Sequence, residues 1–172
     1  MTIDPDWERR SLELWSLLDD LDAEEFRARI DALAGELPAG DPVGLFERGC
    51  ANDSTGRPDV AVPLYREALE RGLDGIRRRR AVIQMASSLR NLGEPQRSVE
   101  LLEAERGRGS DELDDAVVAT LALALADTGR EREAAGLAIG ALARHLPRYN
   151  RSMANYAREL VEDGAGATGE RA

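Results

Sequence analysis

Apolar residues recur along most of the chain at the three- and four-residue spacing of amphipathic helices, and glycine or proline separates the helical stretches. One stretch, GRPDVAVPLYREAL from Gly56 to Leu69, opens with a helix breaker and continues through small and apolar residues. The longest nearly apolar run, from Ala116 to Ala126, is too short to cross a bilayer, so we expect a buried helix there. The pattern predicts a protein built of helices.

The stretch that opens at Gly56 recurs further along the chain. Similar segments begin at Gly93 and Gly129, so the separations are 37 and 36 residues, and another helical segment precedes each glycine. Periods of this size indicate stacked helical hairpins, because one hairpin cannot bury its apolar face alone. We expect each glycine to take the left-handed conformation that ends the first helix of its hairpin.

Small and large residues occupy matched places in the hairpins. The matching positions are Gly49, Gly56, Ala61, Tyr65, Ala68 and Leu69 in the first, Ala86, Gly93, Ser98 and Leu102 in the second, and Ala122, Gly129, Ala134, Ala138, Ala141 and Leu142 in the third. Glu105 departs from the pattern, because a small residue is expected there. With these residues the chain resembles the tetratricopeptide repeat family, and more narrowly a small bacterial group of such proteins.

This resemblance implies an all-α fold, an α-α superhelix (a helical-hairpin solenoid) of about three repeats. We place the repeats at residues 41–74, 75–110 and 111–146. Their spacing slightly exceeds the usual ~34 residues, and we assign the excess to the connections between repeats. Pro63 is expected to kink the second helix of the first repeat or to mark its effective start, because proline removes a helical hydrogen bond.

Further helices are expected on both sides of the repeats. Residues 1–40 predict an acidic helical hairpin packed on the repeats, with Asp22 and Glu25 resembling a capping box at its second helix. Residues 147–163 predict a capping helix, and the glycine-rich residues 164–172 are expected to be disordered. The inward residues of the capping helix are expected to be Met153, Tyr156, Ala157 and Leu160.

Composition agrees with helices and argues against nucleic acid as a partner. Only 4% of the residues are aromatic while 42% are hydrophobic, so the core must be mostly Ala, Leu and Val. The net charge of -10 opposes binding to phosphates, which needs cationic surface. The single cysteine, Cys50, excludes an intrachain disulfide, and the first residues lack a secretory signal, so a cytoplasmic location is expected.

Charge is distributed unevenly along the chain. The first 41 residues carry twelve acidic residues against four arginines, whereas Arg77–Arg80 is an uninterrupted basic run whose simplest interpretation is a solvated face. We hypothesise that the acidic N-terminal hairpin docks over this arginine-bearing surface, either within the chain or between two chains as a homodimer. The acidic residues considered for this contact are Asp19, Asp20, Asp22, Glu24 and Glu25.

The sequence offers no organised catalytic chemistry. His145, the only histidine, has a structural or surface interpretation, and Cys50 is interpreted as a small packing residue. No zinc-ligand spacing, phosphate loop or nucleophile elbow occurs. Gly136 and Gly140 form a GxxxG pattern, which flanking charges assign to close packing of water-soluble helices rather than to a membrane. We therefore expect no enzyme activity, no cofactor, no metal and no membrane association.

Binding is the function that remains. In the resembled family, partners lie along a concave surface lined by the first helix of each repeat. The matching positions here are Glu47, Cys50 and Asp53 in the first repeat, Arg80, Gln84, Ser87, Arg90 and Asn91 in the second, and Thr120, Leu123 and Asp127 in the third. Arg80 and Arg90 offer paired N–H donors to a carboxylate. The resemblance implies a non-enzymatic scaffold for a protein or peptide partner; the alternative is a regulatory module that binds a small molecule or signalling peptide and switches a partner.

Overall fold

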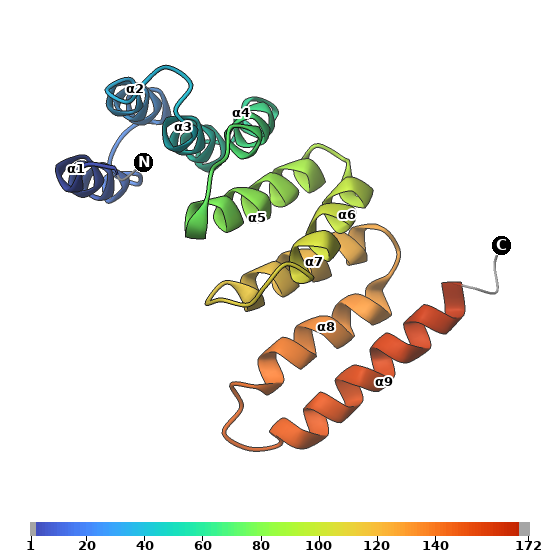
Figure 1. Ribbon diagram of the computed structural model, residues 1–172. Helices are drawn as coiled ribbons and strands as arrows, with labels where there is room; N and C mark the ends of the chain where they lie inside the picture. Colours follow the sequence, from blue (N-terminus) through green and yellow to red (C-terminus); the bar gives the residue numbers. More distant parts are fainter. Residues whose placement is uncertain (1–2, 169–172) are drawn as a thin grey trace. The chain divides into compact units, whose positions relative to one another are not determined.

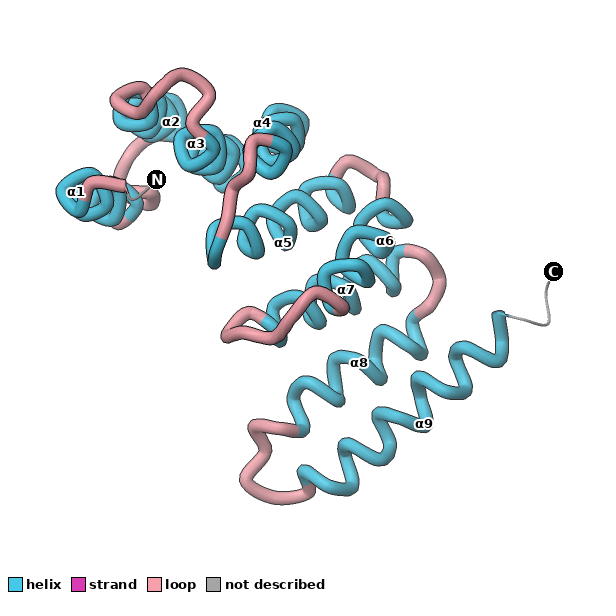
Figure 2. Tube along the Cα trace, in the orientation of Figure 1, coloured by secondary structure: helices cyan, strands magenta, loops and turns pink. Residues whose placement is uncertain are grey.

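The structure is a computed structural model that describes residues 3–168. All regular structure within these residues is helical (Figure 1, Figure 2). The helices are α1 (Pro5–Trp15), α2 (Ala23–Ala34), α3 (Pro42–Ser54), α4 (Pro58–Glu70), α5 (Gly75–Asn91), α6 (Pro95–Arg106), α7 (Asp114–Asp127), α8 (Glu131–Ala143) and α9 (Asn150–Thr168). The all-α helical-repeat fold that the sequence predicts is confirmed.

The chain divides into two compact units, Met1–Ser88 and Leu89–Ala172, and the division falls within α5. In the first unit, α2 packs against α1 and α3, and α3 packs against α4. In the second unit, α6, α7, α8 and α9 each pack against the next helix along the chain. Neighbours in sequence are therefore neighbours in space within each unit, as stacked hairpins require.

The three repeat glycines close their turns in one way. Gly56, Gly93 and Gly129 have φ angles of 78°, 80° and 78°, the left-handed conformation that the sequence predicts. In each turn the backbone N–H after the glycine donates to a carbonyl five residues earlier, at 2.9 Å. The three bonds run from Arg57 to Asn52, from Glu94 to Leu89 and from Arg130 to Leu125. This is the Schellman closure, which satisfies carbonyls that the helix end leaves without partners.

A glycine in α3 permits α4 to approach closely. A Cβ atom added at Gly49 would lie 2.8 Å from the Tyr65 ring, so only glycine leaves room for that ring. Tyr65 is fully buried, and so are Ala61 and Ala68 on the same helix. The small and large positions that mark the first repeat therefore form the α3–α4 interface.

Of the two alternatives expected at Pro63, a kink or an effective helix start, the second is wrong, because α4 continues through this residue. The helix begins at Pro58, five residues earlier, and continues to Glu70. Pro58 occupies the first turn, where the missing N–H costs nothing. The side chain of Pro63 is exposed, so its ring meets solvent rather than a packed neighbour.

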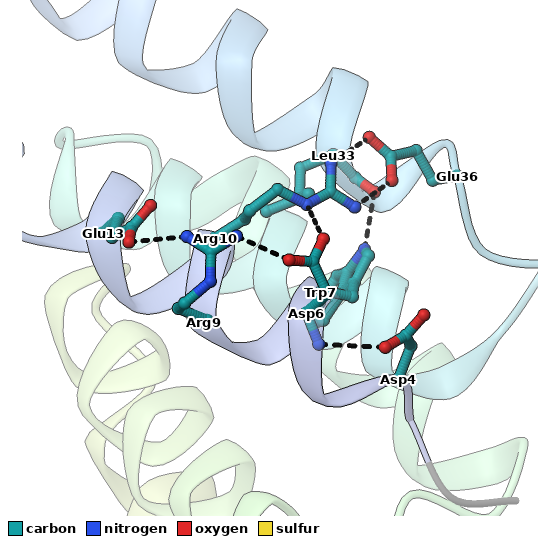
Figure 3. Close-up of polar contacts among 8 residues, drawn as sticks. All are labelled: Asp4, Asp6, Trp7, Arg9, Arg10, Glu13, Leu33 and Glu36. Carbon is teal, nitrogen blue, oxygen red and sulfur yellow. Dashed lines mark hydrogen bonds and ion pairs between the residues drawn. The ribbon is translucent and has the colours of Figure 1, made fainter.

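An indole anchors helix α1 to α2, and a guanidinium anchors it to the turn after α2 (Figure 3). Trp7 is buried, and its indole N–H donates to the Leu33 carbonyl at 2.9 Å. Arg10 donates to both carboxylate oxygens of Glu36, at 2.8 and 2.5 Å. Asp22 caps α2 by accepting from the backbone N–H of Glu25 at 2.9 Å, as the sequence predicts.

Helix α9 packs on the glycine face of α8, and this differs from the repeat pattern. A Cβ at Gly136 would lie 2.8 Å from the Ala157 carbonyl oxygen, so the GxxxG pattern serves close helix packing, as expected. Ala138 lies two residues beyond Gly136 and Leu142 two residues beyond Gly140, so each projects about 200° around the helix from its glycine, and both are exposed. Their expected role as buried repeat positions is therefore wrong, because the capping helix covers the opposite side of α8.

The C-terminal helix is longer than expected. Helix α9 continues to Thr168, five residues beyond the predicted end at 163. The glycines of this segment do not prevent it, because a glycine costs only about 1 kcal/mol in a helix. The remainder of the predicted disordered tail, residues 169–172, lies outside the described residues. Ala157 is buried as predicted, but Tyr156 is 55% exposed, so its inward assignment is wrong.

Candidate functional site

The sequence-predicted binding residues of the first unit lie on α3 and α5. We call the surface formed by Glu47, Cys50 and Asp53 on α3 together with Arg80, Gln84 and Ser87 on α5 the inner face. The helices that carry these residues belong to successive repeats. The structure shows which of the polar groups bond to one another and which remain open to a ligand.

Two hydrogen bonds and one ring contact tie α3 to α5 across this face. The Cys50 thiol donates to the Gln84 side-chain oxygen at 3.2 Å. The Ser88 hydroxyl donates to Asp53 at 2.7 Å. The Arg80 guanidinium carbon lies 5.1 Å from the centroid of the Phe46 ring, within the range of a cation–π contact. Much of the inner face therefore joins the repeats.

Asp53 is partly buried and bonds to two hydroxyl groups. Burial raises its pKa above the ordinary value, while the hydroxyls of Ser88 and Tyr65 lower it by donating to the carboxylate. The Tyr65 hydroxyl lies 3.4 Å from Asp53, and burial raises the pKa of this phenol as well. Because both donors come from the protein itself, Asp53 acts as a bridge between α4 and α5.

Cys50 has no nucleophilic character in this setting. The side chain is 1% exposed, and burial raises the pKa of the thiol from 9.0 to about 12. Only the thiolate is a strong nucleophile, so the thiol is inert near neutral pH. The structure agrees with the packing role that the sequence predicts.

Glu47 is buried in a network that reaches α1. The Trp15 indole N–H donates to one carboxylate oxygen at 2.7 Å, and Arg77 donates to the other at 3.4 Å. Arg77 also donates to both oxygens of Glu8, at 2.9 and 2.5 Å, and this pairing raises the pKa of Arg77. Glu47 is only 4% exposed, so it supports the fold instead of presenting a carboxylate to a ligand.

The basic run is not a solvated face, contrary to the simplest interpretation. Arg77 and Arg78 are half-buried and Arg79 is buried, whereas Arg80 is exposed. Within the chain, Arg77 of this run contacts Glu8 on α1 and Glu47 on α3. The five acids considered from the sequence, Asp19, Asp20, Asp22, Glu24 and Glu25, are all exposed. The homodimer alternative stays a prediction.

Three residues of the inner face remain accessible to a ligand. Arg80 presents its guanidinium above Phe46, and no carboxylate contacts it among the described interactions. Gln84 and Ser87 are half-buried on the same helix. This part of α5 combines a cation with hydrogen-bonding groups beside an aromatic ring. We call Arg80, Gln84 and Ser87 the open segment of the inner face.

The predicted residues of the second unit include one ion pair. Arg90 contacts the carboxylate of Asp127, so at least one of the N–H donors that were expected to face a ligand carboxylate already bonds within the protein. Asn91 is exposed, and the Thr120 hydroxyl donates to the Ala116 carbonyl of its own helix at 2.9 Å. Leu123 is 52% exposed. In this unit Arg90, Thr120 and Asp127 therefore already bond within the protein.

Sequence reasoning missed Glu8, Trp15 and Ser88 as partners of these residues and named Arg77 only as part of the basic run. Arg77 and Glu8 lie 69 residues apart, and no local spacing connects them. Their opposite charges were the available signal, and the charge argument selected the denser acidic cluster at residues 19–25 instead.

Other chemistry has little support among the described residues. His145 contacts Asp115 at 2.8 Å and is exposed, so it has a surface role. No group of three or more histidine, cysteine or acidic side chains within this part of the chain is arranged to hold a metal ion. No helix in the described part of the chain is both long enough and apolar enough to span a membrane.

Comparison with protein-family models identifies a match over the repeats. The family model described as Tetratrico peptide repeat matches residues 42–160, which is more than half of the chain. The match begins at the start of α3 and ends within α9. Comparisons with curated proteins and with solved structures found no match.

Proposed function

We propose that this chain, which belongs to the tetratricopeptide repeat family, is a non-enzymatic scaffold that binds a peptide or protein segment at the inner face. Tetratricopeptide repeats generally mediate protein–protein interaction. Rigid stacked hairpins present a surface that is ordered before binding, which lowers the entropic cost of association. A cytoplasmic location stays a prediction.

The observation that carries this proposal is the position of Arg80. The guanidinium is exposed while Phe46 below it is fully buried, and the cation lies over the aromatic ring. A guanidinium fixed in this way offers paired N–H donors to a carboxylate. Gln84 and Ser87 add donors and acceptors for the backbone of an extended ligand.

The remainder of the inner face supports the open segment without contacting a ligand. Cys50, Asp53 and Glu47 hold α3, α5 and α1 through the bonds described above. These bonds fix the position of α5 and thereby of Arg80. We infer that ligand contact centres on Arg80, Gln84 and Ser87, and that Glu47 and Asp53 have a positioning role.

Affinity capture from a native lysate tests the proposal. The compared proteins are the wild type, Arg80→Ala/Arg90→Ala, and the control Arg66→Ala/Arg106→Ala, whose arginines are exposed on α4 and α6. Loss of a specific partner in the first variant alone supports binding through the predicted residues. Retention of every partner by both variants assigns the interaction to another surface and contradicts the proposal.

The single variants separate the two arginines. Because Arg90 already pairs with Asp127, Arg80→Ala is expected to account for the loss. If Arg90→Ala abolishes capture while Arg80→Ala does not, the open segment is not the contact.

A further inference from the structure

We propose that a second surface, in the second unit, binds an acidic amphipathic helix of a partner protein. The site is a groove of about 890 Å³ between α8 and α9, bordered by α7. Val118, Leu137 and Val161 give it an apolar lining, and Arg144, Arg151 and Arg158 line it as well. This proposal does not depend on the inner face.

The groove is a different surface from the predicted binding face of α7. Val118 is two residues from Thr120, so the two side chains project about 200° apart around the helix. The predicted positions Thr120, Leu123 and Asp127 share neither this direction nor the groove lining. Binding at the groove is therefore separable from binding through the residues of the inner face.

Charge identifies the kind of partner. The chain carries a net charge of -10, yet residues 134–158 contain four arginines and one histidine and no acidic residue. Arg151 is exposed and no interaction of its guanidinium is described, while Arg158 bonds Asn155 of its own helix at 2.5 Å. Glu162 is the acid in the lining, and Arg144 contacts Asp115. Three arginines and one acid therefore line the groove, and because Arg144 pairs with Asp115, Arg151 and Arg158 are the cations that favour carboxylates on a partner.

The spacing of the arginines favours a peptide over a single anionic headgroup. Arg151 and Arg158 are seven residues apart on α9, which places them on one face and roughly 10 Å apart along the axis. One phosphate or carboxylate does not span that distance, whereas carboxylates seven residues apart on a helix have the same spacing. A bound helix running along α9 therefore satisfies both arginines.

Small residues leave space for a helix to approach. Gly140, Ala141 and Ala154 line the groove between the larger apolar side chains. Where small residues meet, helix axes approach to the short end of the usual ~8–10 Å range. The apolar stripe of the ligand lies against Val118, Leu137 and Val161, and its acidic flanks face the arginines.

Fluorescence anisotropy with the full chain tests this assignment. The probe is a labelled helical peptide of about four turns with glutamate on both sides of a leucine stripe. Its control is the same peptide with glutamine for every glutamate. We expect the glutamate peptide to bind the wild type more tightly than the glutamine peptide, and its binding to weaken as salt is added.

Two variants locate the binding. Arg151→Glu/Arg158→Glu is expected to lower the affinity for the glutamate peptide roughly tenfold. The matched double charge reversal Arg66→Glu/Arg106→Glu is expected to leave this affinity unchanged. Ala154→Trp fills the groove without changing charge and is expected to weaken binding as well. Circular dichroism and denaturation of each variant establish that the fold is retained.

Three results overturn the inference. The first is that the glutamate peptide does not bind the wild type. The second is that Arg151→Glu/Arg158→Glu binds this peptide as tightly as the wild type does. The third is that the wild type, but not this variant, binds phosphatidylglycerol vesicles while neither protein binds the peptide. The last result identifies a lipid surface in place of a protein helix. None of the three bears on capture through Arg80.

Discussion

Arg77 donates to both carboxylate oxygens of Glu8, at 2.9 and 2.5 Å, and so joins the first helix of the chain to α5. The same guanidinium reaches the buried Glu47, which also accepts from Trp15. Residues from α1, α3 and α5 thus meet in one charged network. Within the first unit, this network holds the N-terminal helix beside the inner face.

Glu8→Gln is expected to loosen α1. The substitution removes the charge that pairs with a partly buried guanidinium, so we expect a loss of about 1 kcal/mol in the free energy of unfolding. Hydrogen exchange of α1 should become faster. The matched control is Glu13→Gln. Among the described bonds, the Glu13 side chain contacts only Arg9, which lies on the same helix. Equal exchange in the two variants would show that the Glu8–Arg77 pair does not hold α1.

Asp53→Asn is expected to stabilise the protein near neutral pH. Burial raises the pKa of Asp53, so its contribution to stability is full below the unfolded value of 3.8 and is lost as pH rises through the folded value. Asparagine keeps an acceptor for Ser88 and carries no charge. Denaturation should show that the advantage of the variant is larger at neutral pH than at acidic pH. Asp53→Ala, which removes the hydrogen-bond acceptor, is the control. It is expected to destabilise the protein at both neutral and acidic pH.

The Cys50 thiol is expected to resist a disulfide reagent at mildly alkaline pH until the protein unfolds. Its pKa is raised to about 12, so in the folded state it stays protonated where the unfolded thiol ionises near 9.0. The free energy of unfolding should therefore fall as pH rises between these values. A Cys50→Ala variant should show a smaller fall over the same range. Rapid labelling of the native protein would contradict the burial of this thiol.

Two glycines of α8 are expected to respond in opposite directions to alanine. A Cβ at Gly136 would lie 2.8 Å from the Ala157 carbonyl oxygen, so Gly136→Ala should destabilise by about 1–3 kcal/mol. At Gly140 the nearest atom would be 3.6 Å away, an ordinary contact. Gly140→Ala should therefore be neutral or stabilise by up to ~1 kcal/mol through helix propensity. Thermal denaturation of the two variants compares them within one helix.

Periodicity predicted most of the fold because its causes are local. The helices follow from apolar spacing, and Gly56, Gly93 and Gly129 close their turns with the same bond. The third repeat shows the limit of this reasoning. Ala138 and Leu142 fit the repeat pattern but are exposed, because α9 packs on the side of Gly136. Which face of a helix a neighbour covers depends on tertiary packing.

The candidate site was predicted only in part. The positions on α3 and α5 came from the repeat pattern, and the structure brings Cys50 to Gln84 and Arg80 to Phe46. The pattern does not say which polar groups bond to the protein itself. Glu47 was expected to face a ligand, but Trp15 bonds it from 32 residues away in sequence. Such distant pairs leave no signal in local spacing.

Photo-crosslinking tests the inner-face proposal most directly. A photoreactive amino acid is placed at Ser87, about two turns from Arg80 on the same face of α5, and in a matched protein at Arg66, which is exposed on α4. Both proteins are irradiated in native lysate, and the crosslinked partner is identified by mass spectrometry. A specific partner crosslinked from position 87 and not from position 66 is the predicted result. Crosslinking of that partner from position 66 alone would contradict binding at the inner face.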